Sequence, residues 1–387
     1  MRKLICLGFT ALLMTFCRLT FATTEYVIVN NGNSVSNSAT LYKLNTKTGN
    51  LTETAVLQTG GQGASISDNL AQVEQAVSRD SSCIFVLDDG SSDIAVFSKA
   101  SGYKRVGDYF NPNLIAGAYG GTLTRTPDSN FLYASYSYTG NIGAWRVNSD
   151  CTLTFISAYF VSEDFGPIKV TPNAKYLVAS SNTSNWAILF AIDKSGGTLS
   201  ELGTVSFNGG ACARISYCEP HGFDITKDSK FVVFGSNAVD IRRQHPIAVA
   251  LTARITPAGL VNPRVWTLKN SANLYAAMFP FFSTAGYAGS GDLYFGVSGS
   301  GPTGVLTASF TEHPMDFKLR NATSVKAPDN LDGNIAVTGN TMVIAQYPNQ
   351  ISVFRIKKNG SLKLLSTTTI DEQGEGLFSL SIFPNTR

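Results

Sequence analysis

Short stretches of alternating apolar and polar residues recur along this chain at intervals of about 45 to 60 residues. The clearest copies begin at Gln75, Leu123, Ile168 and Gly222. In each copy an alternating run meets a turn built on Asp, Asn, Pro or Ser. An aromatic or β-branched run, a polar loop and a third strand then follow, as at residues 94–97 and 187–190. The pattern predicts antiparallel β-strands joined by tight turns.

A fourth strand closes each unit, and four strands at this period are typical of a propeller blade. Weaker copies at residues 276–297 and 334–354 complete the count. One four-stranded sheet cannot bury both of its faces until neighbouring sheets stack against it. We therefore predict an all-β fold, a seven-bladed β-propeller with four-stranded antiparallel blades.

The two ends of the chain each supply an incomplete blade. The segment that starts at Glu25 contains a second, a third and a fourth strand, with no inner strand before them. The segment that starts at Gly376 matches the inner-strand entry at residues 166–172 and then stops. We predict that the C-terminal strand pairs with the N-terminal strands, which closes the ring without a covalent link and removes exposed sheet edges.

Composition agrees with a single large β-domain. The chain has 387 residues with 35 Gly, 24 Phe and 15 Tyr, but only 15% are charged, and no long helical period appears. A ring of blades can share one continuous packing over more residues than an ordinary domain. We assign residues 23–387 to a single propeller domain.

Residues 1–22 have the pattern of a signal peptide. Arg2 and Lys3 precede an apolar run that ends at Phe16, and Ala22 supplies the small residue before the cut. The apolar run is too short for a comfortable membrane span. The sequence therefore predicts a secreted or periplasmic protein that is not inserted in a membrane.

Loss of this segment also changes the charge. It removes three basic residues and no acidic one, so the formal net charge falls from +3 to zero. A neutral chain lacks the excess of positive charge that binding to nucleic acid requires.

We also expect the protein to be a monomer.

Cysteine usage also favours export. Without the signal segment, four cysteines remain, an even number that suggests two disulfide bonds in an oxidising compartment. In the predicted topology, Cys83 begins a second strand and Cys151 lies in a hairpin of the next unit, on the same face of the ring. Cys212 and Cys218 flank one loop. We predict the pairs Cys83–Cys151 and Cys212–Cys218, and four buried free thiols are the alternative.

Candidate chemistry gathers on the face where the inner strands begin. The loop between the second and third strands returns to this face, so ligand sites of propellers collect there, around the central channel. In the unit that contains Gly222, the inner-strand entry and this loop bring together two His, two Arg and two acidic residues: Glu219, His221, Asp240, Arg242, Arg243 and His245. The chain has only three His, and an exposed His can transfer protons near neutral pH. The alternative is ordinary loop polarity, with His221 capping a turn.

Other candidates carry less information. Asp88 and Asp89 lie in the equivalent loop of an earlier unit, where they could act as a general base, hold a cation or contact substrate, although Asp-Asp-Gly is also an ordinary turn. Motifs for a zinc site, a P-loop or a nucleophile elbow are missing from the sequence. We expect no cofactor and no metal.

Several motifs together resemble a known family. They are the inner-strand entries of the type P-x-x-x-x-x-x-D-x-(K/N)-(F/Y), the tails T-G-N-L-T and G-G-T-L-S after the third strand, and the C-terminal G-E-G-L-F-S-L-S-I-F-P. The chain is similar over residues 25–387 to the lactonase family of seven-bladed propellers, which includes 6-phosphogluconolactonases and carboxy-muconate cyclases. The resemblance implies a lactone bound on the channel face, with Arg and His at blade entries. A typical entry reads Pro-Arg followed by His or Gly, whereas here Pro220-His221-Gly222 has His221 in the Arg place, and Pro167-Ile168-Lys169 has no His.

The leading hypothesis is an exported lactone hydrolase acting on an unphosphorylated sugar lactone or another small lactone. His221 would activate water, Glu219 would orient His221, and Arg242 or Arg243 would stabilise the carbonyl oxyanion. Further substrate contacts would come from His245, Asp240, Asp88 and Asp89. The competing hypothesis is a non-catalytic propeller that binds a protein, a glycan or a cell-surface component through the same face.

Overall fold

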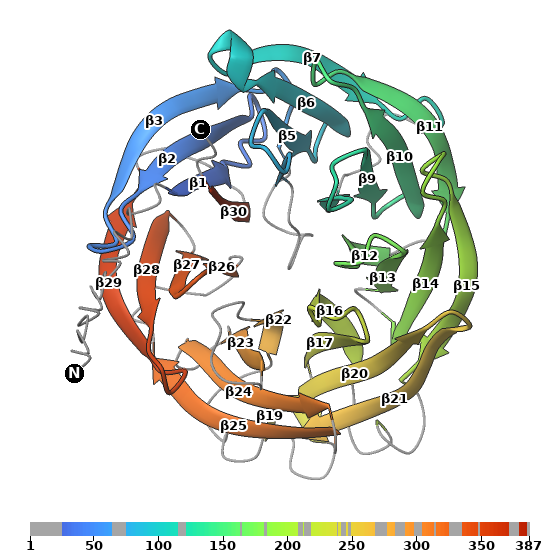
Figure 1. The fold of residues 1–387 in the computed structure, drawn as a ribbon, viewed down its shortest axis with the longest axis vertical. Helices are drawn as coiled ribbons and strands as arrows, with labels where there is room; N and C mark the ends of the chain where they lie inside the picture. The colour runs from blue at the N-terminus through green and yellow to red at the C-terminus, as the bar shows by residue number, and fades with distance from the viewer. Residues whose placement is uncertain are drawn as a thin grey trace, which may run out of the picture.

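The structure, a computed structural model, consists of small antiparallel sheets arranged around a centre as a propeller (Figure 1). It describes residues 25–63, 75–114, 121–162, 165–181, 184–207, 212, 218–237, 239–240, 245–246, 249–267, 277–282, 291–297, 304–312, 315–324, 335–346, 349–370 and 379–384. The predicted signal segment, residues 1–22, lies outside the described residues. Helix is nearly absent from the described part, which contains one short 3-10 turn at Lys99–Ser101.

Each four-stranded sheet has its first strand nearest the centre and its fourth at the rim (Figure 1). In chain order, the first three complete sheets contain β4 (Gln75–Val77), β5 (Cys83–Asp88), β6 (Asp93–Ser98) and β7 (Lys104–Phe110); β8 (Leu123–Arg125), β9 (Phe131–Tyr136), β10 (Asn141–Val147) and β11 (Leu153–Phe160); and β12 (Phe165–Val170), β13 (Tyr176–Ser181), β14 (Trp186–Ile192) and β15 (Leu199–Ser206). The next three contain β16 (Glu219–Ile225), β17 (Phe231–Asn237), β20 (Val249–Thr256) and β21 (Gly259–Thr267); β22 (Ala277–Phe282), β23 (Gly291–Val297), β24 (Gly304–Glu312) and β25 (Met315–Ser324); and β26 (Ile335–Thr338), β27 (Thr341–Gln346), β28 (Gln350–Ile356) and β29 (Leu362–Thr369). A short hairpin of β18 (Val239–Asp240) and β19 (His245–Pro246) is inserted after β17.

The remaining sheet joins the two ends of the chain. Its strands are β1 (Glu25–Asn30), β2 (Ser38–Leu44), β3 (Leu51–Gln58) and β30 (Ser379–Pro384). β30 is the innermost strand and pairs antiparallel with β1, with Val29 opposite Leu380. The predicted pairing of the C-terminal and N-terminal strands is confirmed.

Polar side chains reinforce this closure on the side of the next sheet. The Ser379 hydroxyl donates to Gln75 Oε1 at 2.5 Å, and Gln75 Nε2 donates to the Ser381 hydroxyl at 3.2 Å. Gln75 begins β4, so β30 is tied to the inner strand of the adjacent sheet as well as to β1.

The hydrophobic core lies between neighbouring sheets. Alternate residues of β5 divide between two clusters: Phe85 packs with residues of the β8–β11 sheet, whereas Ile84 packs with residues of the β1–β3 sheet. Both side chains are fully buried. Because successive side chains of a strand point to opposite faces, a strand covered on both sides is apolar throughout. This explains why the second and third strands read as continuous apolar runs in the sequence.

A repeated turn follows the inner strand in several sheets. In one copy the Thr126 hydroxyl donates to Asp128 Oδ1 at 2.6 Å and accepts the Phe131 N–H at 3.1 Å. Equivalent bonds are made from Ser78, Thr171 and Thr226. These turns contain the Asp, Asn, Pro and Ser residues that the sequence analysis assigned to turns, and they set the spacing between the first and second strands.

Two disulfide bonds join the four cysteines of the described part. Cys83 pairs with Cys151 at a Cα–Cα distance of 5.5 Å, and this bond links two neighbouring sheets. Cys212 pairs with Cys218 at 6.1 Å, just before β16 begins. Both predicted pairings are confirmed. In the described part of the chain, no helix is long and apolar enough to span a membrane.

Candidate functional site

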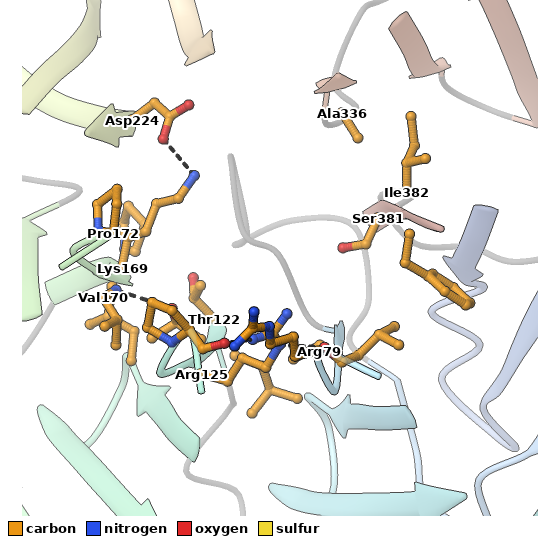
Figure 2. Close-up of a pocket in the computed structure, with 18 of the residues that line it drawn as sticks. Arg79, Thr122, Arg125, Lys169, Val170, Pro172, Asp224, Ala336, Ser381 and Ile382 are labelled. Carbon is orange, nitrogen blue, oxygen red and sulfur yellow. Dashed lines mark hydrogen bonds and ion pairs between the residues drawn. The ribbon is translucent and has the colours of Figure 1, made fainter. Parts of the chain in front are cut away.

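A cavity of about 960 Å³ occupies the centre of the ring (Figure 2). Its described walls come from six inner strands and the turns that follow three of them: β4, β8, β12, β16, β26 and β30. The volume lies in the usual range for a small-molecule site. We call it the channel cavity.

Each inner strand runs from one face of the ring to the other. We call the face where inner strands begin the entry face and the one where they end the exit face. The turns that line the channel cavity, including Arg79, Asp128 and Asn173, come directly after inner strands. The channel cavity therefore extends to the exit face.

Charged side chains are concentrated in one sector of the lining. Three basic and two acidic residues contribute among the described residues: Arg79, Arg125, Lys169, Asp128 and Asp224. Lys169 Nζ lies 2.7 Å from Asp224 Oδ1 (Figure 2). The Lys169 side chain is 38% exposed, whereas that of Asp224 is 13% exposed, so the pair forms a partly buried wall of the cavity.

Arg125 is held in place by backbone carbonyl groups. Its Nε donates to Val77 O of β4, and Nη1 donates to Thr126 O at 3.0 Å and to Pro127 O at 3.3 Å. Burial lowers the pKa of Arg125; the charge of Asp128 opposes this shift, and the charge of Arg79 adds to it. A guanidinium stays charged after such a shift because its ordinary pKa is above 12.

Three residues of the predicted catalytic and binding cluster, Glu219, Asp240 and His245, have their backbones on the entry face. Glu219 begins β16 and pairs with Asn237 at the end of β17. The hairpin that follows β17 pairs Asp240 with His245. The fold thus brings the backbones of these residues to one face.

The remaining members of the predicted cluster are less defined. His221 lies within β16, but its side chain is outside the described part. Arg242 and Arg243 lie outside the described residues altogether. None of the six predicted residues belongs to the described lining of the channel cavity. Their catalytic and binding roles remain predictions.

Asp88 and Asp89, predicted for substrate binding, are buried on the entry face. Their exposed fractions are 0% and 1%. Asp88 Oδ1 accepts a hydrogen bond from Asn37 Nδ2 at 2.7 Å, and Asn37 Nδ2 also donates to Asn30 Oδ1 at 2.8 Å. Burial, followed by the charge of Asp93, raises the pKa of Asp88 to about 7. The hydrogen bond from Asn37 to Asp88 links the sheet of β1 to the sheet of β5. A role of Asp88 and Asp89 in substrate binding stays a prediction.

The sequence analysis did not identify Arg79, Arg125, Lys169 or Asp224 as site residues. The sequence does contain a signal for the last two: when the repeats are aligned on the Thr of the turn, Thr171 or Thr226, Lys169 and Asp224 each stand two residues before that Thr. Equivalent positions of adjacent inner strands lie at one level of the channel. Arg79 and Arg125 occupy different positions in their repeats, so no alignment pairs them.

The described part of the chain contains no cluster of three or more His, Cys, Asp or Glu side chains that could hold a metal ion. The polar groups of the channel cavity can instead bind a small polar molecule through hydrogen bonds and charge. Guanidinium groups are suited to carboxylate or phosphate oxygens, and hydroxyl groups can bind the hydroxyls of a sugar.

Residues 109–215 match the family model "Lactonase, 7-bladed beta-propeller". This segment includes the sheets β8–β11 and β12–β15. Comparison with curated proteins finds no match.

Solved structures share the fold. A candidate 6-phosphogluconolactonase from Bacteroides fragilis has a TM-score of 0.68 at 13% identity, over 93% of this chain and 98% of that one. A protein from Lactobacillus plantarum and a functionally unknown protein from Desulfotomaculum acetoxidans each have a TM-score of 0.64 at 14% identity, over 93% of this chain and 99% of theirs. At this identity the likeness concerns the fold alone. The family match therefore covers residues 109–215, and the solved structures support the β-propeller fold over most of the chain.

Proposed function

We propose that this protein is a lactonase-like enzyme that binds a small lactone in the channel and opens its ring with water. One observation carries the proposal: a propeller with a lactonase-family match has a central cavity of about 960 Å³ lined by charged and hydroxyl side chains. A small lactone fits this volume, and its carbonyl and hydroxyl oxygens need the donors that such a lining offers.

The reaction requires a base, a group for the oxyanion and a proton for the leaving oxygen. His221 would take a proton from water as the water oxygen adds to the lactone carbonyl carbon. Arg242 or Arg243 would stabilise the resulting oxyanion, and Glu219 would orient His221. The ring C–O bond then breaks, the departing alkoxide takes the proton, and the product is a hydroxy acid.

The test is a hydrolysis assay on a panel of unphosphorylated aldonolactones and homoserine lactones, followed by acid release at constant pH. We expect turnover of at least one lactone and its loss in His221→Ala. His313→Ala is the matched control, since His313 lies between β24 and β25 in the chain, far from the entry of β16 in sequence. A panel without turnover above the spontaneous rate, or equal rates for His221→Ala and the parent, would refute this mechanism.

The alternative function is a binding propeller without catalysis, whose partner would be a protein, a glycan or a cell-surface component. The charged and hydroxyl side chains that line the channel cavity would serve binding as well as hydrolysis. Binding without turnover in the same panel would support it.

The complete architecture and location are part of the proposal. We infer seven blades, because seven four-stranded sheets occur among the described strands and the matching family model is seven-bladed. We also infer that residues 1–22 direct export and that the mature protein is a secreted or periplasmic monomer. The two disulfide bonds support an oxidising compartment.

A further inference from the structure

Two arginines of neighbouring inner-strand segments meet at the exit end of the channel cavity (Figure 2). Arg79 is the second residue after β4, and Arg125 ends β8. Both side chains line the cavity and lie together in Figure 2, and the charge of Arg79 acts on that of Arg125. Two like charges at one place oppose each other unless an anion lies between them.

The hydrogen bonds of Arg125 determine which part of it is available. Nε and Nη1 are used by carbonyl groups of Val77, Thr126 and Pro127. Nη2 donates to no atom of the described residues, although Arg125 lines the cavity. The Arg79 side chain is exposed and likewise makes no hydrogen bond within the described part.

The nearest acidic side chains, Asp128 and Asp80, act on Arg125 through their charge, but both accept hydrogen bonds from other residues. Asp80 accepts hydrogen bonds from the hydroxyls of Ser78 and Ser82, both at 2.7 Å. Asp128 Oδ1 accepts from Thr126, and its Oδ2 accepts from Asn130. Within the described residues, neither Arg79 nor Arg125 forms an ion pair with a carboxylate.

The adjacent wall of the cavity does not neutralise this pair. Lys169 and Asp224 bind each other at 2.7 Å, so their charges offset one another locally. Asp128 and Asp80 offset part of the charge of the two arginines. Among the described residues that line the cavity, three basic side chains face two acidic ones, so the lining keeps an excess of positive charge.

A buried hydroxyl in the same lining has no partner. Thr122 is 4% exposed, and its Oγ1 makes no hydrogen bond within the described part of the chain. Its backbone N–H donates to the Ser135 hydroxyl at 2.7 Å, which fixes the residue. A buried hydroxyl without a partner is costly, and a ligand hydroxyl in the cavity would satisfy it.

We propose that the exit end of the channel is a binding site for a small hydroxylated organic anion, whose carboxylate or phosphate group lies between Arg79 and Arg125. The hydroxyl-bearing part of the ligand extends along the channel and contacts Thr122 and the Lys169–Asp224 pair. The anion-binding end of the site lies at the opposite end of the inner strands from His221, so anion binding can be tested separately from hydrolysis.

The test is calorimetric titration of the full mature chain with D-galacturonate, D-galactose and inorganic phosphate. Galacturonate and galactose differ by a carboxylate, so the comparison isolates the charge. We expect galacturonate to bind, and galactose to bind at least about tenfold more weakly, because galactose lacks the carboxylate and so loses a charge-assisted hydrogen bond. Phosphate that binds while galacturonate does not would support the same site with a phosphate group as the anion.

Substitutions locate the anion. Arg79→Gln should weaken anion binding by about tenfold or more without lowering the melting temperature, because the Arg79 side chain has no hydrogen bond or ion pair within the described residues to lose. Arg125→Gln should also weaken anion binding, but it removes the hydrogen bonds to Val77 and to the turn after β8 as well. If the Arg125 variant does not fold, the result for Arg79→Gln alone tests the proposal. Arg264→Gln, on the exposed rim strand β21, is the matched control.

The proposal is overturned if neither anion binds, if galactose binds as tightly as galacturonate, or if Arg79→Gln binds both anions like the parent. None of these results depends on whether lactones are hydrolysed. A hydrolytically inactive protein that still binds galacturonate through Arg79 would refute the proposed reaction and support the anion site.

Discussion

Replacement of Asp88 by Asn should change how stability depends on pH. Asp88 is fully buried between the sheet of β1 and the sheet of β5, and its Oδ2 has no hydrogen-bond partner within the described residues. Burial and the charge of Asp93 raise its pKa from the ordinary 3.8 to about 7. Arg105, Asp108 and Asp93 are the other charged groups that influence this region.

The sign follows from which state binds the proton more tightly. With a raised pKa, the folded protein holds the Asp88 proton more tightly than the unfolded chain does. The stabilising contribution is therefore complete below about pH 4 and is lost as the pH rises from about 4 to about 7. The difference between the two pKa values of Asp88 corresponds to about 4 kcal/mol over this window.

Asp88→Asn removes this titration while keeping an oxygen for the hydrogen bond from Asn37. We expect the free energy of unfolding of the variant, relative to the parent, to increase by up to about 4 kcal/mol between pH 4 and pH 8. The assay is equilibrium urea unfolding followed by tryptophan fluorescence at five pH values in this range. Glu201→Gln, at an exposed carboxylate of β15, is the control and should follow the parent.

Parallel pH profiles for Asp88→Asn and the parent would refute the reasoning, because they would mean that Asp88 has the same proton affinity in the folded and unfolded states. A larger loss of stability at pH 8 than at pH 4 in the variant would refute it as well, since it would require an ionised Asp88 that stabilises the fold.

Two further predictions concern the links that hold the ring together. Replacing Cys83 and Cys151 by Ala opens a loop with a sequence separation of 68, which should lower the free energy of unfolding by about 4 kcal/mol. The same change at Cys212 and Cys218, with a separation of 6, should lower it by about 2 kcal/mol. Urea unfolding measures both losses, and equal losses would argue against a loop-closure origin of the stabilisation. Removing residues 379–387 takes away β30 and leaves the edge of β1 unpaired, so we expect oligomers or aggregates by light scattering. A monomer as stable as the parent would contradict the closure.

Much of the fold could be predicted because its signals are local. The predicted third strands at residues 94–97 and 187–190 lie within β6 and β14. The predicted terminal pairing also followed from local strand and turn signals at each end. These elements depend on alternation and turn chemistry, which a short window of sequence contains.

The candidate site was less accessible for a physical reason. Asp88 looked like a turn residue, and its burial depends on Asn37, which comes from a different sheet. Arg79 and Arg125 come together where two consecutive sheets stack, at positions that are not equivalent in the repeats. Contacts of this kind arise from packing between blades and have no signature within one repeat.

The most direct test of the account is a crystal structure of the protein grown with D-galacturonate. The account predicts the sugar acid in the channel cavity, with its carboxylate between Arg79 and Arg125 and a hydroxyl on Thr122. A channel that holds neither galacturonate nor, in a parallel crystal grown with inorganic phosphate, a phosphate ion would contradict it. A sugar acid bound only on the outer surface of the blades would contradict it as well.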